Sequence, residues 1–123
     1  MSTRSRIGIL NADGSVDSIY CHHDGYLSHV GDLLINCYDT ENKIRELLSL
    51  CDISSLEGTV KQTRDFAYNS KGEDTEVLHS ENESKFLESG EEYNYIFKNG
   101  KWHVYGYDFE DAEVTPELIE KDS

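Results

Sequence analysis

The spacing of hydrophobic and polar residues changes along the chain, and the change predicts strands first and helices after them. Residues 7–10 and 16–21 are rich in β-branched and apolar residues, and residues 11–14 between them read Asn-Ala-Asp-Gly. This is a turn sequence in which Gly14 can take a positive φ, so the two runs predict a β-hairpin. The next apolar residues recur with helical spacing: Leu27, Val30, Leu33, Leu34, Cys37 and Tyr38. They predict a helix over residues 28–38 with one apolar face.

A second amphipathic helix is expected directly after the first. Asp39 or Thr40 can cap its N-terminus. Its apolar stripe consists of Ile44, Leu47, Leu48 and Cys51. The short connection predicts a helical hairpin lying on the sheet. Because Cys37 and Cys51 fall on the apolar stripes, we expect both thiols to be buried and inert.

The middle of the chain has weaker periodicity. Residues 60–63, 66–68 and 76–79 each have the composition of a short strand. Ser80, with Glu83 three residues later, fits a capping box for a short helix that ends at Gly90.

The clearest local pattern lies in residues 93–107, where two aromatic runs flank a turn. Asn99 and Gly100 both tolerate a positive φ, so they predict a two-residue type I′ hairpin in which Phe97 faces Trp102. We assign one face of this hairpin to the core: Tyr93, Tyr95, Phe97, Trp102 and Val104. The opposite face carries Asn94, Ile96, His103, Tyr105 and Tyr107.

These elements predict a single small α+β domain over residues 1–123. It consists of an antiparallel sheet, a two-helix hairpin packed on one face, and an aromatic C-terminal β-hairpin. An acidic tail follows over about residues 108–123, in which Pro116 can open a last short helix.

Charge adds a strong constraint on partners. The chain has 123 residues and a net charge of −14, and residues 71–123 carry 15 acidic and 5 basic residues, a net of −10. Direct binding to nucleic acid is therefore disfavoured, whereas a protein with a basic nucleic-acid-binding surface is complementary. The alternative is that the acidity only keeps the protein soluble. The candidate partner-binding carboxylates are Glu88, Glu91, Glu92, Glu110, Asp111 and Glu113.

The sequence favours a cytoplasmic protein. No apolar run approaches the length of about 18 residues that a transmembrane helix needs, and no apolar segment follows Arg4 and Arg6 as a signal peptide would require. The three cysteines are widely spaced, which indicates reduced thiols rather than a disulfide framework.

Residues 20–26 hold the densest chemistry of the chain: Tyr-Cys-His-His-Asp-Gly-Tyr. The residue types suit zinc, but in a strand Cys21 and His23 point away from His22 and Asp24, so the spacing fits poorly. Cys21 and His22 as nucleophile and base meet the same objection, because neighbours on a strand cannot face one another.

Two other interpretations of this segment remain open. In the first, the cluster is structural: Asp24-Gly25 forms a turn, and Asp24 binds backbone N–H groups at the start of the helix. In the second, four side chains line a small polar pocket for an anion such as a nucleotide phosphate: Tyr20, His22, Asp24 and Tyr26. No P-loop, GxGxxG, HExxH or Ser-His-Asp pattern occurs, so we expect no enzyme, catalytic residue, metal or cofactor.

The chain resembles a family of short, mostly uncharacterised proteins of tailed bacteriophages and prophages. The residues that carry the resemblance are Thr3-Arg4-Ser5, Ile19 to Tyr26, Gly31, Asp52 to Leu56 and Glu91 to Tyr95. Two positions depart from the family pattern: His23 stands where Trp is usual, and Cys51 stands where Gly often precedes the Asp. The resemblance implies a phage origin and no particular activity.

Size, acidity and this resemblance lead to a functional hypothesis. We expect a non-enzymatic phage inhibitor, of the anti-CRISPR or DNA-mimic type, that binds a host nucleic-acid enzyme or defence complex through its acidic surface inside the infected bacterium. The alternative is a small-ligand binder, such as a sponge for a nucleotide signal, built on residues 20–26. The sequence leaves the target and the oligomeric state open.

Overall fold

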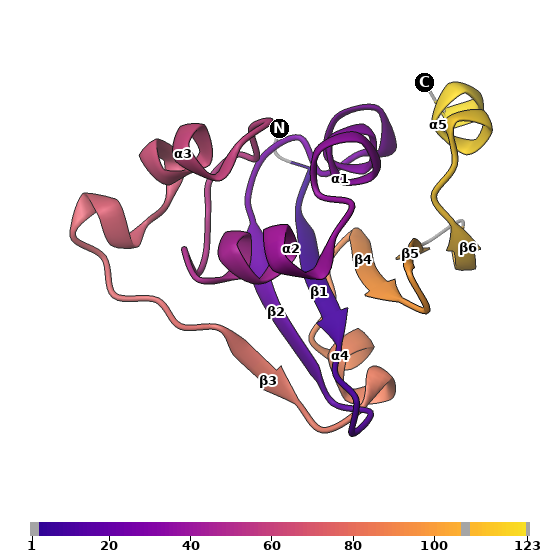
Figure 1. The fold of residues 1–123 in the computed structure, drawn as a ribbon, viewed down its shortest axis with the longest axis horizontal. Helices are drawn as coiled ribbons and strands as arrows, with labels where there is room; N and C mark the ends of the chain where they lie inside the picture. The colour runs from indigo at the N-terminus through magenta and orange to yellow at the C-terminus, as the bar shows by residue number, and fades with distance from the viewer. Residues whose placement is uncertain (1–2, 107–108, 123) are drawn as a thin grey trace.

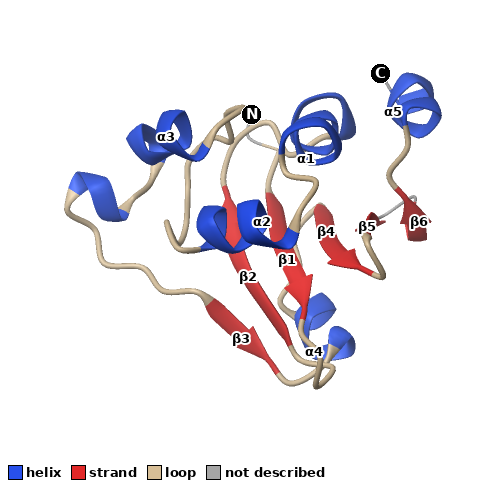
Figure 2. Ribbon diagram, viewed as in Figure 1, coloured by secondary structure: helices blue, strands red, loops and turns tan. Residues whose placement is uncertain are grey.

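The computed structural model describes residues 3–106 and 109–122, and a six-stranded sheet runs through this part of the molecule (Figure 1, Figure 2). The strands are β1 (Ser5–Leu10), β2 (Val16–Cys21), β3 (Leu78–Ser80), β4 (Tyr93–Lys98), β5 (Lys101–Gly106) and β6 (Phe109–Glu113). The α-helices are α1 (Asp32–Cys37), α2 (Glu41–Leu48), α3 (Val60–Thr63), α4 (Glu83–Glu88) and α5 (Pro116–Asp122). This single domain confirms the predicted α+β class.

The sheet is mixed rather than purely antiparallel, which corrects one detail of the prediction. Its order is β3-β2-β1-β4-β5-β6, and β1 pairs with β4 in parallel while the other neighbours are antiparallel. The first hairpin leaves one edge of β1 open, and the C-terminal hairpin joins that edge through β4. The periodicity of a strand shows which of its side chains share a face. It does not show whether a strand distant in sequence pairs with it in parallel or antiparallel.

Both predicted hairpins are present. Asn99 (φ 55°) and Gly100 (φ 77°) have the positive φ values that the two-residue turn requires, and Phe97 pairs with Trp102 as predicted. The residues assigned to the core face are buried or half-buried: Tyr93, Tyr95, Phe97, Trp102 and Val104. Tyr107, assigned to the opposite face, lies outside the described residues.

The predicted pair of helices packs on one face of the sheet. A π-helical turn, η1 (Leu27–Gly31), leads directly into α1, and Thr40 caps α2 by accepting a hydrogen bond from the backbone N–H of Lys43 at 3.3 Å. The buried core on this face includes Ile7, Ile9, Ile19, Leu34, Ile44 and Leu47. The Trp102 indole donates to the carbonyl oxygen of Tyr38 at 2.8 Å, which ties β5 to the end of α1.

Cys51 does not lie on the buried stripe of α2. The helix ends at Leu48, and Cys51 adopts a left-handed backbone conformation with φ 64° beyond it. Cys37 and Cys51 are both half-buried. The apolar spacing overestimated the length of this helix by about one turn, because spacing alone does not locate the residue at which a helix ends.

The short helix α4 lies on the other face of the sheet. Phe86 of α4 packs against Val16 and Ile96, whose side chains point away from the α1–α2 side. The cap of α4 is Asn82, whose Oδ1 accepts from the backbone N–H of Lys85 at 2.9 Å. The prediction of Ser80 as the cap was wrong, since Ser80 is the last residue of β3.

Two predicted strands in the middle of the chain were also wrong. Residues 60–63 form α3, because Thr59 caps the segment by accepting from the backbone N–H of Gln62 at 3.1 Å. Residue 66 ends a 3₁₀ turn (Arg64–Phe66), and Ala67 after it forms an isolated bridge with Ile53. A side-chain cap such as Thr59 stabilises a helical turn by more than the weak strand propensity of the residues opposes it.

The segment expected to be an acidic tail is structured where it is described. Residues 109–113 add β6 to the edge of the sheet, and Pro116 opens α5 as predicted. Asp108 and Ser123 lie outside the described residues. A strand made of Phe-Glu-Asp-Ala-Glu has no apolar alternation, so the sequence gives no sign of β6.

Candidate functional site

Four segments far apart in the sequence meet near the start of β1 and the end of β2. We call them the junction, which comprises residues 3–5, 19–26, 52–56 and 91–95. The backbone N–H of Gly25 donates to the carbonyl of Thr3 at 2.8 Å, and the Tyr95 hydroxyl donates to the carbonyl of Gly25 at 2.7 Å. The backbone N–H of Ile53 donates to the carbonyl of Tyr20 at 2.9 Å. The segments that carry the resemblance are therefore hydrogen-bonded to one another.

Gly25 is the tightest point of the junction. A Cβ at this position would lie 2.8 Å from the Cβ of Ser5 and 2.9 Å from the carbonyl oxygen of Thr3, so a larger residue does not fit without movement. Asp24, directly before it, has a left-handed backbone with φ 57°, a conformation that Asp and Asn accept better than most residues. Asp24 and Gly25 lead from β2 into the helical turn that begins at Leu27. The predicted binding of Asp24 to backbone N–H groups at the helix start is not seen in the described residues, where Asp24 accepts instead from the Tyr26 hydroxyl.

Cys21 is fully buried on the core side of β2. Burial raises the pKa of its thiol to about 12, so the thiol is protonated at neutral pH. Its Sγ lies 3.5 Å from the carbonyl oxygen of His23. A buried, protonated thiol is a poor nucleophile and a poor metal ligand, which favours a packing role for Cys21.

The four side chains proposed to line a ligand pocket form two separate hydrogen-bonded pairs. The Tyr20 hydroxyl and Nδ1 of His22 are 2.7 Å apart, and the Tyr26 hydroxyl donates to Oδ1 of Asp24 at 3.2 Å. Tyr20 and His22 are half-buried, whereas Tyr26 is exposed. None of the four lines the large hollow beside Asn94 or the one beside α3, so a ligand site at this position stays a prediction.

Three of the six candidate partner-binding carboxylates are in ion pairs within the protein. Glu88 lies 3.3 Å from Nζ of Lys85, and Glu113 lies 3.4 Å from Nζ of Lys101. Asp111 lies 3.2 Å from Nζ of Lys98. These contacts partly neutralise the three carboxylates, so they contribute less to an external electrostatic surface.

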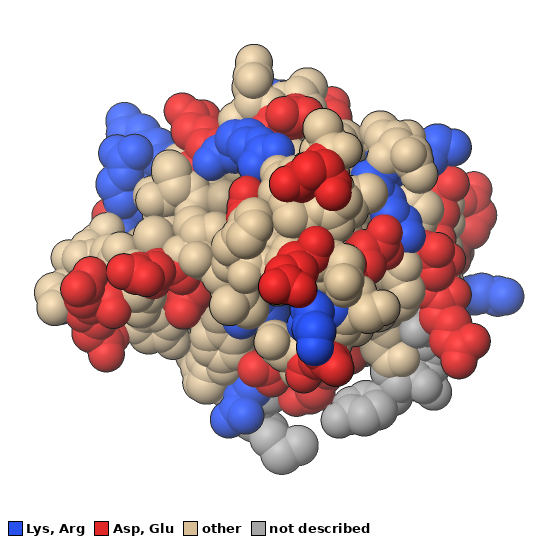
Figure 3. All heavy atoms as spheres, turned by 90° about the horizontal axis from the view of Figure 1, so that it is seen from below, with Lys and Arg blue, Asp and Glu red and all other residues tan. Residues whose placement is uncertain are grey.

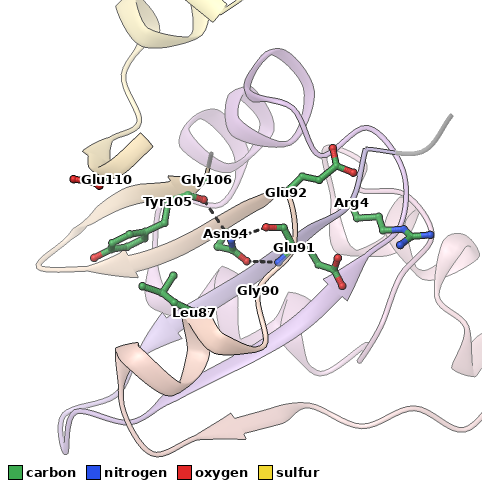
Figure 4. Close-up of a pocket in the computed structure, with 9 residues that line it drawn as sticks. All are labelled: Arg4, Leu87, Gly90, Glu91, Glu92, Asn94, Tyr105, Gly106 and Glu110. Carbon is green, nitrogen blue, oxygen red and sulfur yellow. Dashed lines mark hydrogen bonds between the residues drawn. The ribbon is translucent and has the colours of Figure 1, made fainter. Parts of the chain in front are cut away.

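The other three carboxylates gather around one open hollow, which we call the acidic hollow. Its volume is about 610 Å³, and its lining includes Glu91, Glu92, Glu110, Arg4, Asn94 and Tyr105. In Figure 4, Arg4, Glu91 and Glu92 lie at one end of the hollow and Tyr105 and Glu110 at the other. No Lys, Arg or His nitrogen of the described residues lies within 4.0 Å of these three carboxylates.

Asn94 fixes the wall of the acidic hollow. Its Oδ1 accepts from the backbone N–H of Glu91 at 2.8 Å, and its Nδ2 donates to the carbonyl of Glu91 at 2.9 Å and to that of Tyr105 at 3.4 Å (Figure 4). Because Asn94 is buried, these bonds hold the 91–92 segment against β5. The sequence placed Asn94 on the correct face of the hairpin but gave no reason to assign it to a site.

Two guanidinium groups moderate the charge near this hollow. Arg4 is exposed and lines it. Arg6 is buried and donates from Nε to Oγ of Ser18 at 3.1 Å. Burial lowers the pKa of Arg6, and the nearby charges of Asp52 and Glu91 oppose this shift. The hollow is therefore negative on balance without being uniformly negative.

One face of the molecule carries charges of both signs. On the face drawn in Figure 3, carboxylates are interspersed with Lys, Arg and uncharged side chains rather than merged into one acidic area. A diffuse charge of this kind supports solubility more than specific recognition. The acidic hollow is accordingly the stronger candidate for a specific contact.

Residues 3–106 and 109–122 contain neither a metal-binding cluster nor a membrane-spanning helix. In these ranges no three His, Cys, Asp or Glu side chains are grouped closely enough to hold a metal ion. None of the helices in the same ranges has the length and apolar character needed to cross a bilayer.

Comparison with known proteins adds no further constraint: no family model, no curated protein and no solved structure matches this chain. The resemblance to phage proteins therefore rests on the quoted residues and stays a prediction. The charges and the geometry of the described residues are the basis for a functional proposal.

Proposed function

We propose that this protein is a phage-encoded, non-enzymatic inhibitor of the anti-CRISPR or DNA-mimic type. It binds the basic nucleic-acid-binding surface of a host enzyme or anti-phage defence complex in the cytoplasm of the infected bacterium. The observation that carries the proposal is the set of three carboxylates around the acidic hollow that lack an ion-pair partner among the described residues: Glu91, Glu92 and Glu110.

Charge complementarity explains why such a surface suits this class of partner. Proteins that bind nucleic acid present Lys and Arg to phosphate groups, and carboxylates placed on those cations compete with the phosphates. The net charge of −14 attracts a basic surface at long range, while the local carboxylates determine where it docks.

The shape of the hollow suits an arginine of the partner. Its volume of about 610 Å³ exceeds that of a single side chain, and its polar groups lie on both sides of the opening (Figure 4). A guanidinium group can bind a carboxylate through two parallel hydrogen bonds, so one inserted arginine can engage Glu91 or Glu92. Arg4 lies at the same end of the hollow as Glu91 and Glu92, so its charge opposes part of their attraction for such a group.

Affinity capture from a bacterial lysate tests this proposal. The lysate is treated with nuclease, so that captured proteins are not bridged by nucleic acid. The test variant is E91Q/E92Q/E110Q. The matched control is E73Q/D74N/E76Q, which removes the same number of negative charges from exposed positions between η3 (Asn69–Lys71) and β3.

We expect wild type and the matched control to retain the same basic partner and E91Q/E92Q/E110Q to lose it. The partner's nucleic-acid binding or cleavage should fall as wild-type protein is added. Loss of the partner with both triple variants would mean that only net charge matters. Retention with both would contradict the role of the acidic hollow.

A further inference from the structure

A second hollow has the opposite charge and lies on the helical side of the molecule. It opens between the end of α1, α2 and α3, and its volume is about 640 Å³. We call it the basic hollow, and its lining includes Lys43, Lys61, Arg64, Glu46, Cys37 and Val60. Its volume falls in the range of about 300 to 1,000 Å³ typical of small-molecule sites.

The charge of this hollow contrasts with that of the chain. The protein has only 11 Lys and Arg residues and a net charge of −14, yet three cations and one carboxylate line this hollow. Lys61 and Arg64 have no carboxylate of the described residues within 4.0 Å. Lys43 lies 3.3 Å from Asp39, but both side chains are more than half exposed, so this ion pair is weak.

The floor of the basic hollow is apolar and held in place. Cys37 and Val60 are half-buried and pack against the core. The Tyr38 hydroxyl donates to the carbonyl of Glu57 at 2.7 Å, which fixes the loop before α3 to the end of α1. An apolar floor under a cationic rim suits a ligand with one apolar end and one anionic end.

The local backbone brings together the two cations that lack an ion-pair partner in the described part of the chain. Thr59 caps α3, and Lys61 and Arg64 are three residues apart along this helical segment, so their side chains project in similar directions. One Arg and one Lys can together surround a doubly charged phosphate, to which guanidinium groups bind in a forked geometry.

We propose that the basic hollow binds a small phosphomonoester with an apolar or aromatic body, such as a nucleoside monophosphate. The phosphate contacts Lys61 and Arg64, and the body lies on Cys37 and Val60. The site uses elements that do not line the acidic hollow, so it can be present whether or not the inhibitor proposal is correct.

Titration with AMP tests the proposal, with adenosine and inorganic phosphate as the two half-ligands. We expect AMP to raise the melting temperature in a saturable way, because a ligand that binds only the folded state stabilises it. Each half-ligand should have a weaker effect. Adenosine binding as tightly as AMP would overturn the anionic part, and equally tight binding of inorganic phosphate would overturn the apolar part.

Matched variants locate the site. K61Q/R64Q should weaken AMP binding by about tenfold or more, the loss expected when charge-assisted hydrogen bonds are removed. K71Q/K121Q changes the net charge equally at exposed positions outside the hollow and should bind like wild type. E46Q removes the carboxylate of the lining and should tighten binding. Equal AMP affinity for K61Q/R64Q and wild type would overturn the proposal.

Cys37 supplies an independent readout, because it lies in the floor of the hollow. In a C51S background, Cys37 is the half-buried thiol that remains, since Cys21 is fully buried. Saturating AMP should slow the reaction of Cys37 with a thiol reagent several-fold in folded protein. An unchanged rate at saturating AMP would place the ligand elsewhere and overturn the proposal.

Discussion

The junction and the acidic hollow share Arg4, Glu91, Glu92 and Asn94, but their polar groups are satisfied in opposite ways. In the junction, backbone and side-chain groups bond to each other, as when Tyr95 donates to the carbonyl of Gly25 at 2.7 Å. In the acidic hollow, Glu91, Glu92 and Glu110 face open space without ion-pair partners among the described residues. Residues 20–26, which hold the densest chemistry of the chain, therefore belong to the hydrogen-bonded framework. The side chains available to a partner are the carboxylates that this framework supports.

Strand alternation explains how one segment serves both regions. Successive side chains of β4 point to opposite faces of the sheet. Tyr95 therefore points into the core and reaches Gly25, while Asn94 points to the other face and holds Glu91. Changes on one face should affect stability, and changes on the other should affect binding.

The largest effect on stability is expected from Gly25→Ala. The new Cβ would lie 2.8 Å from Cβ of Ser5, and the backbone around it is fixed by hydrogen bonds. We expect the free energy of unfolding to fall by about 2 to 3 kcal/mol, measured by denaturant titration.

Gly58→Ala is the matched control for this change. The nearest atom to a Cβ at Gly58 is Sγ of Cys37 at 3.8 Å, which is an ordinary contact. Its effect should stay within about 1 kcal/mol of zero. If Gly25→Ala were as stable as Gly58→Ala, the junction would not be a constrained framework.

A smaller effect is expected from Tyr95→Phe, which keeps the ring and removes the hydroxyl. The buried carbonyl of Gly25 loses its donor, so the free energy of unfolding should fall by about 1 to 2 kcal/mol. Tyr26→Phe removes an exposed hydroxyl that contacts Asp24 at 3.2 Å and should leave stability nearly unchanged. Equal effects of the two substitutions in chemical denaturation would remove the distinction between buried and exposed bonds.

The smallest effect on stability is expected from Asp111, which lies in the edge strand β6. Burial alone would raise the pKa of Asp111, but the hydrogen bond from Lys98 and the charges of Lys98 and His103 outweigh it, so the pKa is lowered. A lowered carboxyl pKa stabilises the folded state above the unfolded-state pKa, and this contribution is lost as pH falls through the folded-state pKa.

Asp111→Asn tests this contribution while preserving the backbone, because Asn also accepts the φ of 51° found there. The variant should lose less stability than wild type between about pH 7 and pH 3. The difference should stay below about 1 kcal/mol, since nearly half of the Asp111 side chain is exposed to solvent. A steeper acid loss in the variant than in wild type would contradict the direction given for this pKa.

The sequence correctly predicted the turns and caps that depend on residues close together along the chain. Asn99-Gly100 specifies a turn by its φ preferences, and Thr40 caps a helix with a side chain three residues from its donor. The parallel pairing of β1 with β4 and the strand β6 depend on contacts across the chain, which local patterns do not encode.

The same limit applies to the candidate site. Glu88 follows Lys85 by three residues, a spacing that favours an ion pair on a helix, but for the other five carboxylates only the fold shows which of them reach a cation. Asp111 of β6 meets Lys98 of β4 across the intervening strand β5, whereas Glu91 and Glu92 line the hollow beside Asn94, which holds the backbone of Glu91. No sequence spacing distinguishes these two outcomes.

The most direct test of binding through the acidic hollow is the salt dependence of affinity for the captured partner. Between about 0.1 M and about 1 M salt the screening length falls from about 10 Å to about 3 Å, so charge-driven binding weakens steeply. We expect a steep dependence for wild type and E73Q/D74N/E76Q, and a weaker, flatter one for E91Q/E92Q/E110Q. The same slope and affinity for all three proteins would contradict the proposal.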